Sequence, residues 1–243
     1  MTERLPDVPR QSAFFFDFDG TLVAIAPRPD LVAVEPRVRD VLAALSEQFD
    51  GALAIVTGRP LDVVDGFMAP LQLATAAEHG SIRRDAAGGM HIDPGNAAAV
   101  EAAHTALEAF AKDKPGLLLE RKRSSIALHY RARPELAAAC EAAVETVVAD
   151  NPELVILPGK MVFELKPKGV DKGEAVRAFL GEAPFRGRTP VFIGDDVTDE
   201  HAFAVVNALR GISVKIDDGA TLAQYRTDRK GLFDWLFQLV ERV

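Results

Sequence analysis

Two aspartates, Asp17 and Asp19, stand two positions apart after a short apolar run at residues 13–16. An apolar run that is too short for a helix and ends at turn-forming residues is typical of a buried strand. In an extended chain, side chains at positions i and i+2 point to the same face, so we expect the two carboxylates to lie together. Because like charges repel at this range, the pair favours a bound cation such as Mg²⁺. A plain strand followed by an Asp-Gly turn explains the same residues equally well.

Polar residues follow two further apolar runs. Thr57 comes directly after residues 52–56, and Asp195 and Asp196 come after residues 190–193. In an open parallel sheet, ligands bind at the carboxyl ends of the strands, so these residues could gather around one ligand. Acidic residues also favour helix N-termini, which is an alternative explanation for Asp199.

Lys172 follows Asp171, which has the residue type of a helix N-cap. A cation in the first helical turn is unfavourable against the helix dipole, so Lys172 indicates a nearby anion or carboxylate. Taken alone, a solvated surface lysine is the simpler interpretation.

The first and last thirds of the chain alternate between strand and helix patterns. Predicted strands cover residues 13–16, 52–56, 73–77, 190–193 and 211–214, and predicted helices cover residues 38–48, 61–67, 173–180, 198–206 and 232–243. Such alternation favours a parallel sheet with right-handed crossovers.

The middle third has a different pattern. It predicts helices at residues 96–112 and 135–149, and strands at residues 117–121, 125–131, 154–157 and 161–166, the last two joined by Pro158-Gly159. This order indicates a separate α+β unit with a four-stranded antiparallel sheet. Alternation along its strands places apolar residues on one face and polar residues on the other. A solvated polar face is common in such sheets, although this one would also suit a ligand rich in hydroxyl groups.

Composition narrows the class of protein. The chain has 243 residues, of which 48% are hydrophobic and 26% charged, as is ordinary for a globular protein with a core. Its net charge of −8 argues against a nucleic-acid-binding surface. No apolar run reaches membrane-spanning length, and the first ten residues lack the apolar region of a signal peptide, so we expect a cytoplasmic protein. The single cysteine, Cys140, excludes an internal disulfide.

Together, the motifs resemble those of the haloacid dehalogenase (HAD) superfamily of phosphohydrolases. The matching segments are Asp17-Phe18-Asp19-Gly20-Thr21, Thr57-Gly58-Arg59, Lys172 and Gly194-Asp195-Asp196, in the order of the superfamily. The resemblance implies an α/β fold, with a HAD-like doubly wound parallel sheet (a Rossmann-like core) and an inserted α+β cap domain. We expect the catalytic core at residues 1–95 and 167–243, and the cap, which determines substrate specificity, at residues 96–166.

The resemblance also implies roles for individual residues. Asp17 would be the nucleophile that forms an aspartyl-phosphate, and Asp19 the general acid and base. Thr57 and Lys172 would bind phosphoryl oxygens. Mg²⁺ would be held by Asp17, the main-chain carbonyl of Asp19 and Asp195, with support from Asp199 and with Asp196 near the waters of the metal shell.

Further segments are similar to trehalose-6-phosphate phosphatases within this superfamily. They are Ala77-Glu78-His79-Gly80, Glu120-Arg121-Lys122, His129-Tyr130-Arg131, Gly159-Lys160-Met161-Val162-Phe163-Glu164 and Gly194-Asp195-Asp196-Val197-Thr198-Asp199-Glu200. This similarity implies hydrolysis of trehalose 6-phosphate by a phosphoric monoester hydrolase. The implied substrate-binding residues are Gly58, Arg59, His79, Glu120, Lys122, Lys160 and Glu164.

Other functions remain open at this stage. The same chemistry could serve another sugar phosphate, such as sucrose phosphate or mannosyl-3-phosphoglycerate, or a phosphomutase. A non-catalytic sugar-phosphate-binding module is a third alternative, although a binder needs no nucleophile with an acid partner. We expect a monomer that acts on a small-molecule substrate, with neither nucleic acid nor membrane as a partner.

Overall fold

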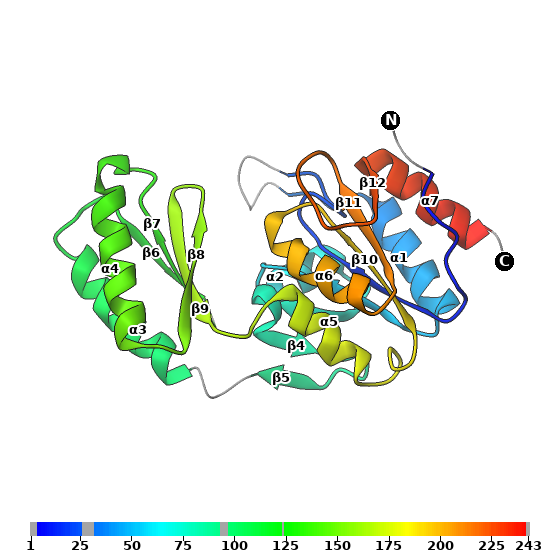
Figure 1. The fold of residues 1–243 in the computed structure, drawn as a ribbon, viewed down its shortest axis with the longest axis horizontal. Helices are drawn as coiled ribbons and strands as arrows, with labels where there is room; N and C mark the ends of the chain where they lie inside the picture. Colours follow the sequence, from blue (N-terminus) through cyan, green and yellow to red (C-terminus); the bar gives the residue numbers. More distant parts are fainter. Residues whose placement is uncertain (1–3, 26–31, 93–96, 123, 242–243) are drawn as a thin grey trace. The chain divides into compact units, whose positions relative to one another are not determined.

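The chain forms two compact units, shown in a computed structural model that describes residues 4–25, 32–92, 97–122 and 124–241 (Figure 1). Unit 1 comprises Met1–His91 and Asp171–Val243, and unit 2 comprises Ile92–Val170. The second expected domain boundary, at residues 166–167, lies close to the corresponding break between the units. The first, at residues 95–96, lies outside the described residues.

Unit 1 is built on an eight-stranded sheet. Its strands, in spatial order, are β12 (Tyr225–Thr227), β11 (Ile212–Ile216), β10 (Thr189–Gly194), β1 (Ser12–Phe16), β2 (Leu53–Val56), β3 (Ala74–Ala77), β4 (Ile82–Arg84) and β5 (Met90–Ile92). In this spatial order, the first six strands, from β12 through β1 to β3, are parallel to one another, and β4 runs antiparallel to β3. The chain proceeds from β1 to β2 and β3 on one side, and later fills the other side with β10 and β11. The order therefore reverses beside β1, where a doubly wound sheet binds its ligands.

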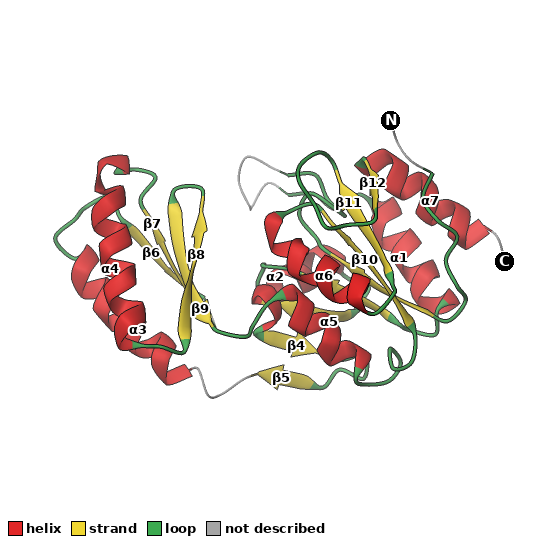
Figure 2. Cartoon of the chain, in the orientation of Figure 1, coloured by secondary structure: helices red, strands yellow, loops and turns green. Residues whose placement is uncertain are grey.

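Helices cover both faces of this sheet (Figure 2). Helices α1 (Pro36–Gln48), α2 (Leu61–Met68) and α7 (Arg229–Glu241) contribute to one core, and α5 (Lys172–Leu180) and α6 (Glu200–Ala208) to the other. Strand β1 lies between the two cores: Phe14 and Phe16 face the first, whereas Phe15 faces the second. All three rings are fully buried, and each such burial stabilises the fold by about 1.5–3 kcal/mol. The strand that precedes Asp17 is therefore fixed from both sides.

Unit 2 has its own sheet and core. Its antiparallel strands are β6 (Leu118–Arg121), β7 (Ile126–His129), β9 (Val162–Pro167) and β8 (Leu154–Gly159), in this spatial order. Helices α3 (Ala97–Ala111) and α4 (Ala137–Asp150) pack on one face of the sheet. The buried side chains of Ile126, Leu128 and Leu165 on the sheet share a core with buried residues of these helices, among them Cys140 of α4. The opposite face, termed the polar face, carries Glu120, His129 and Glu164, with apolar side chains such as Ala127 and Leu157 between them.

The structure corrects several details of the sequence-based assignment. Pro158 and Gly159 belong to β8, and the turn falls at Lys160 and Met161, where Met161 has a positive φ of 64°. Proline is tolerated there because β8 is an edge strand, which has free N–H positions. The short strands β4, β5 and β12 were not predicted. Helix α7 begins at Arg229, earlier than expected, while the expected helix ends at Asn96 and Val243 lie outside the described residues.

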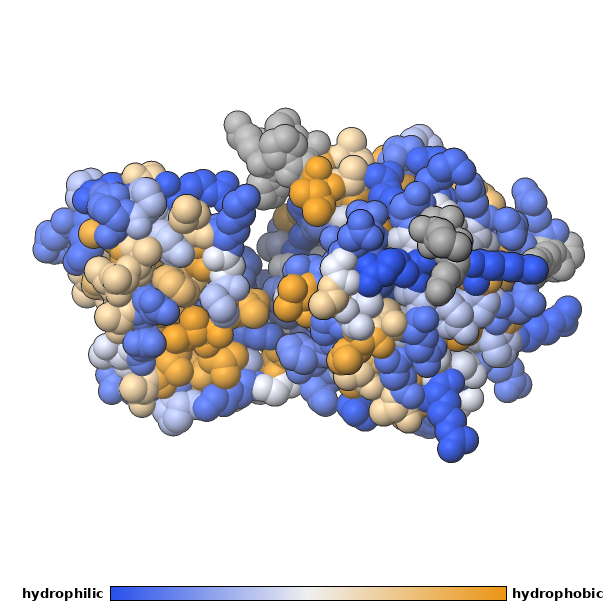
Figure 3. All heavy atoms as spheres, turned by 45° about the horizontal axis from the view of Figure 1, so that its top comes forward, coloured by the Kyte–Doolittle hydropathy of each residue, from blue (hydrophilic) through white to orange (hydrophobic). Residues whose placement is uncertain are grey.

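In the view of Figure 3 the surface of unit 1 is mostly hydrophilic, whereas unit 2 shows a larger share of apolar residues. Large exposed apolar side chains include those of Ile25, Val197 and Leu222. Within the part of the chain that the structure describes, no helix combines the length and the apolar character needed to cross a membrane.

Candidate active site

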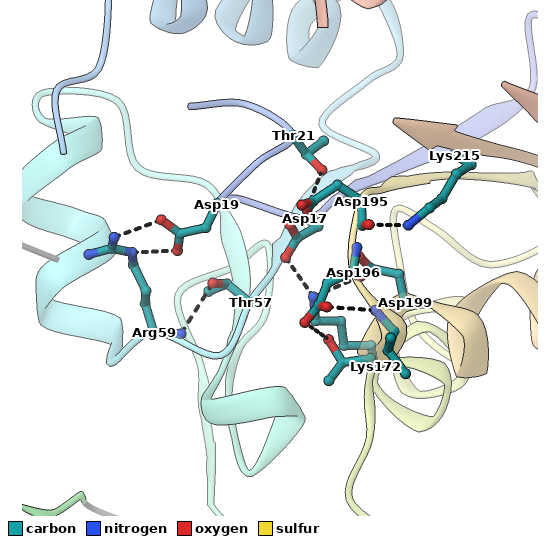
Figure 4. Close-up of polar contacts among 12 residues, drawn as sticks. Asp17, Asp19, Thr21, Thr57, Arg59, Lys172, Asp195, Asp196, Asp199 and Lys215 are labelled. Carbon is teal, nitrogen blue, oxygen red and sulfur yellow. Dashed lines mark hydrogen bonds and ion pairs between the residues drawn. The ribbon is translucent and has the colours of Figure 1, made fainter. Parts of the chain in front are cut away.

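The centre of the site is the ammonium group of Lys172. Its Nζ donates to Oδ1 of Asp17 at 2.6 Å and to Oδ1 of Asp199 at 2.7 Å (Figure 4). The three side chains are at most 5% exposed. Lys172 begins helix α5 directly after its N-cap Asp171, whose side chain accepts from the Glu174 N–H at 2.9 Å. The two carboxylates thus supply the anions that a lysine at a helix N-terminus requires.

The acidic groups of the site exceed its cations, and their protonation equilibria reflect this excess. Burial raises the pKa of Asp17 to about 7, against the lowering effect of Lys172, and the Asp195 carboxylate adds to the increase. Burial likewise raises the pKa of Asp199 to about 7 and shifts the pKa of Asp195 upward. Burial alone would lower the pKa of Lys172, but Asp17 and Asp199 outweigh it and the pKa is raised. One lysine therefore does not balance the buried negative charge.

Three of these carboxylates could hold a metal ion. Asp17, Asp195 and Asp199 each offer an oxygen, and these oxygens lie within 4.8 Å of one another. Asp195, the residue that follows β10, is held by two contacts. Thr21 Oγ1 donates to Asp195 Oδ1 at 3.3 Å, and the buried Lys215 donates to the Asp195 main-chain carbonyl. An all-oxygen donor set with excess negative charge suits a hard divalent cation.

Asp196, the remaining acidic residue of this loop, has a local structural role. Its side chain accepts from the Val197 N–H at 2.7 Å and forms a capping box with Asp199, whose Oδ2 accepts from the Asp196 N–H at 2.9 Å. The Asp196 carboxylate therefore caps the short helical turn that follows it, and it is not one of the three carboxylates, Asp17, Asp195 and Asp199, that lie close together.

The carboxylates of Asp19 and Asp17 have different partners, although the i, i+2 spacing predicts that they point together. Strand β1 ends at Phe16, and the chain then turns, closed by a bond of 2.8 Å from the Gly20 N–H to the Val23 carbonyl. Gly20 has a φ of +82°, and a Cβ there would clash with the Asp195 carboxylate, so the turn requires glycine. Consequently, the Asp19 carboxylate is directed at Arg59, while Asp17 is directed at Lys172.

The loop after β2 carries three further predicted site residues. Thr57 is buried, and its Oγ1 accepts from the Arg59 N–H at 3.1 Å. The His79 N–H donates to the Thr57 carbonyl at 2.8 Å. A Cβ on Gly58 would lie 2.7 Å from the His79 ring, so glycine allows the ring to pack against the loop. His79, with a φ of 59°, thus lies next to Thr57 and Gly58.

Unit 2 presents its predicted residues on the polar face of its sheet. Lys122 Nζ donates to both oxygens of Glu164 at 3.0 Å, and Ser125 Oγ donates to Glu164 Oε1 at 2.7 Å. Glu120 Oε2 contacts His129 Nε2 at 2.9 Å. A fourth residue, Lys160, is exposed at the turn between β8 and β9.

Three residues near these groups were missed by sequence reasoning. Thr21 and Lys215 contact Asp195, and Ser125 contacts Glu164. A signal existed for Lys215, which interrupts the otherwise apolar end of β11 and is only 4% exposed. Thr21 and Ser125 lie in turns, where polar residues are ordinary and mark no site.

Comparisons with known proteins place the chain in a family. The family model described as trehalose-phosphatase matches residues 15–230. The chain is 44% identical over 229 residues to a trehalose-6-phosphate phosphatase of Escherichia coli (strain K12), covering 93% of this chain and 86% of that protein. It is 42% identical over 205 residues to a probable trehalose-phosphate phosphatase of Sinorhizobium fredii (strain NBRC 101917 / NGR234), covering 84% and 77%.

A solved structure is similar over the whole fold. The crystal structure of a trehalose-6-phosphate phosphatase related protein superposes with a TM-score of 0.77 at 26% identity, covering 95% of this chain and 97% of that one. This similarity confirms the predicted α/β fold with its large parallel sheet and separate antiparallel sheet. The chain therefore belongs to the trehalose-phosphatase family of HAD-like phosphatases.

Proposed function

We propose that the chain hydrolyses trehalose 6-phosphate to trehalose and inorganic phosphate, with Asp17 as the nucleophile. The observation that carries the proposal is the buried Asp17 carboxylate, which follows the central strand β1 and contacts Lys172 at 2.6 Å. A carboxylate held in this way suits attack on a phosphoryl group whose charge a lysine can balance. Family membership and the relatives' names support the choice of substrate.

The reaction takes two steps. First, an oxygen of Asp17 bonds to phosphorus while the bond between phosphorus and the sugar oxygen breaks. The sugar oxygen keeps that electron pair, takes a proton from Asp19 and leaves as trehalose. Water then bonds to phosphorus, gives a proton to Asp19, and the bond between phosphorus and Asp17 breaks. One water is consumed, and both carboxyl groups return to their starting states.

Lys172 and Thr57 would bind the phosphoryl oxygens during both steps. The Thr57 oxygen already accepts from the Arg59 N–H, so its own hydrogen can be donated to a phosphoryl oxygen. Lys172 has three N–H donors, of which two are directed at Asp17 and Asp199. Fixed donors of this kind favour the transition state because they need not reorganise as charge spreads over the oxygens.

The residues of the site fit Mg²⁺ as the cation. Asp17, Asp195 and the main-chain carbonyl of Asp19 would hold it. Asp199 would act from outside, because Lys172 and the Asp196 N–H already occupy its two oxygens. When bound, Mg²⁺ supplies positive charge to the phosphoryl oxygens. The raised pKa values of Asp17, Asp195 and Asp199 support a cation there, because a cation would relieve the repulsion between ionised carboxylates.

The polar face of unit 2 is our candidate for sugar recognition. We assign the binding of sugar hydroxyl groups to Glu120, Lys122, Lys160 and Glu164. Lys122 and Ser125 hold the Glu164 carboxylate in one orientation, which suits an acceptor of hydroxyl hydrogens. A cytoplasmic enzyme that acts as a monomer on a small molecule remains our expectation.

Asp17→Asn should reduce phosphate release from trehalose 6-phosphate by on the order of 10³-fold or more, because an amide cannot attack phosphorus. The measurement is kcat for phosphate release, with a thermal melt to confirm that the variant folds. Asp62→Asn, which removes an exposed carboxylate from helix α2, is the matched control and should keep full activity. Near-wild-type kcat in Asp17→Asn would contradict the proposal.

Removal of divalent metal with EDTA should abolish activity, and Mg²⁺ should restore it. Independently of activity, calorimetry should show Mg²⁺ binding to the wild type, weakened at least about tenfold in Asp195→Asn. Asp218→Asn removes an exposed carboxylate elsewhere and should bind Mg²⁺ normally. Persistent activity in the chelator, or equal Mg²⁺ affinity in all three proteins, would rule out the assigned site.

Glu164→Ala should raise KM for trehalose 6-phosphate about tenfold and change kcat/KM for p-nitrophenyl phosphate less than about twofold, because the small substrate lacks the sugar hydroxyls. Glu145→Ala, on the exposed side of helix α4, is the control. Equal losses on both substrates would show that Glu164 does not recognise the sugar.

A further inference from the structure

Arg59 holds both oxygens of the Asp19 carboxylate. Its Nε donates to Oδ2 at 2.5 Å, and its Nη2 donates to Oδ1 at 2.6 Å. This is the two-point geometry in which arginine binds carboxylates and phosphates most strongly. Asp19 therefore has a fixed partner in this structure, and that partner is a different cation from the lysine at Asp17.

The arginine is the better-fixed member of the pair. Its guanidinium lies 5.2 Å from the centre of the Phe67 ring and 5.8 Å from that of Phe18, and these two rings stack on each other. Its main chain is anchored at both ends, since its N–H donates to Thr57 Oγ1 and its carbonyl accepts from the Glu78 N–H at 3.1 Å. The Arg59 side chain is 13% exposed, compared with 37% for Asp19. If the pair opens, we therefore expect the aspartate to move.

The pair conflicts with the acid and base role of Asp19. Protonation removes the negative charge that strengthens the pair, and a hydrogen on the side of the carboxyl that faces Arg59 would point at an N–H group. The acid form of Asp19 is therefore disfavoured while both bonds to Arg59 are made, and proton transfer to a leaving oxygen favours release of the pair. A phosphoryl group can bring this about, because its oxygens bind a guanidinium in the same two-point manner as a carboxylate.

We propose that Arg59 is a latch that holds Asp19 withdrawn in the free enzyme and releases it when phosphoryl oxygens bind to Arg59. The inference rests on the proposed function and adds a regulatory step to it. Asp19 becomes available only while a phosphoryl group occupies the site, during attack by Asp17 and during hydrolysis of the aspartyl-phosphate. After phosphate leaves, Asp19 returns to Arg59. Arg59 is thus a phosphate-binding residue that also positions the general acid.

The latch makes Asp19 and phosphate competitors for one arginine, and binding measurements can test this competition. The probe is inorganic phosphate, titrated by calorimetry at a fixed Mg²⁺ concentration into four proteins: wild type, Asp19→Asn, Arg59→Met and the double variant. We expect Asp19→Asn to bind phosphate about tenfold more tightly than the wild type, because the amide has no charge and offers only one acceptor oxygen, so it competes less well with phosphate for Arg59. In the Arg59→Met background, the same Asp19→Asn change should alter the affinity less than about twofold.

Loss of a negative charge near an anion site can strengthen phosphate binding without any latch. The four proteins form a double-mutant cycle, which separates this general charge effect from the competition for Arg59. An equal gain in both backgrounds, or no gain in either, would overturn the latch. Asp62→Asn on α2 controls for a general change in charge and should bind phosphate as the wild type does. If Asp19→Asn does not fold, Asp19→Ser completes the same cycle. A failure of the proposed function looks different, because the wild type would then neither bind phosphate nor release it from trehalose 6-phosphate.

Discussion

The contact on which the site depends is the buried ammonium of Lys172, shared by Asp17 and Asp199 at 2.6 and 2.7 Å. It joins three segments that are far apart in the sequence: the end of β1, the start of α5 and the turn after β10. Removing one member of such a buried group is costly, because the charges left behind have neither water nor a partner. One lysine for several acids also leaves negative charge in excess, which creates a place for a divalent cation.

The topology of unit 1 explains why these segments meet. Strands β1 and β10 are neighbours, and Phe16 at the end of β1 is in register with Ile193, the last residue but one of β10. Asp17 and Asp195 therefore leave the same edge of the sheet beside each other. Because the strand order reverses there, the crossover connections leave β1 and β10 in opposite directions, which is where doubly wound sheets bind ligands. The two cores on either side of β1 pack the strand from both faces, which suits the positioning that the proposed nucleophile Asp17 requires.

Much of this arrangement could be predicted from the sequence. The runs before Asp17, Thr57 and Asp195 are apolar and bounded by turn residues, so their strands and the gathering of their ends were predictable. The four-stranded sheet of unit 2 was predictable from alternation, as at Ile126 and Leu128. The three-residue strands β4, β5 and β12 are too short for a period to show, and the apolar side chains of β5, Met90 and Ile92, are exposed rather than buried. The partners of individual side chains were harder to predict from the sequence. The i, i+2 rule assumes an extended chain, whereas the chain turns at Gly20, next to Asp19.

The central claim is that phosphate passes through a covalent bond to Asp17, and direct trapping of this species is its most immediate test. The wild-type enzyme would be mixed with trehalose 6-phosphate labelled at phosphorus, quenched in acid within milliseconds, digested and mapped by mass spectrometry. The account predicts labelled protein during turnover, with the phosphoryl group on the peptide that contains Asp17 and on that residue. Label on another residue, or turnover without any protein-bound phosphate under conditions in which trapping captures a known aspartyl-phosphate, would contradict it.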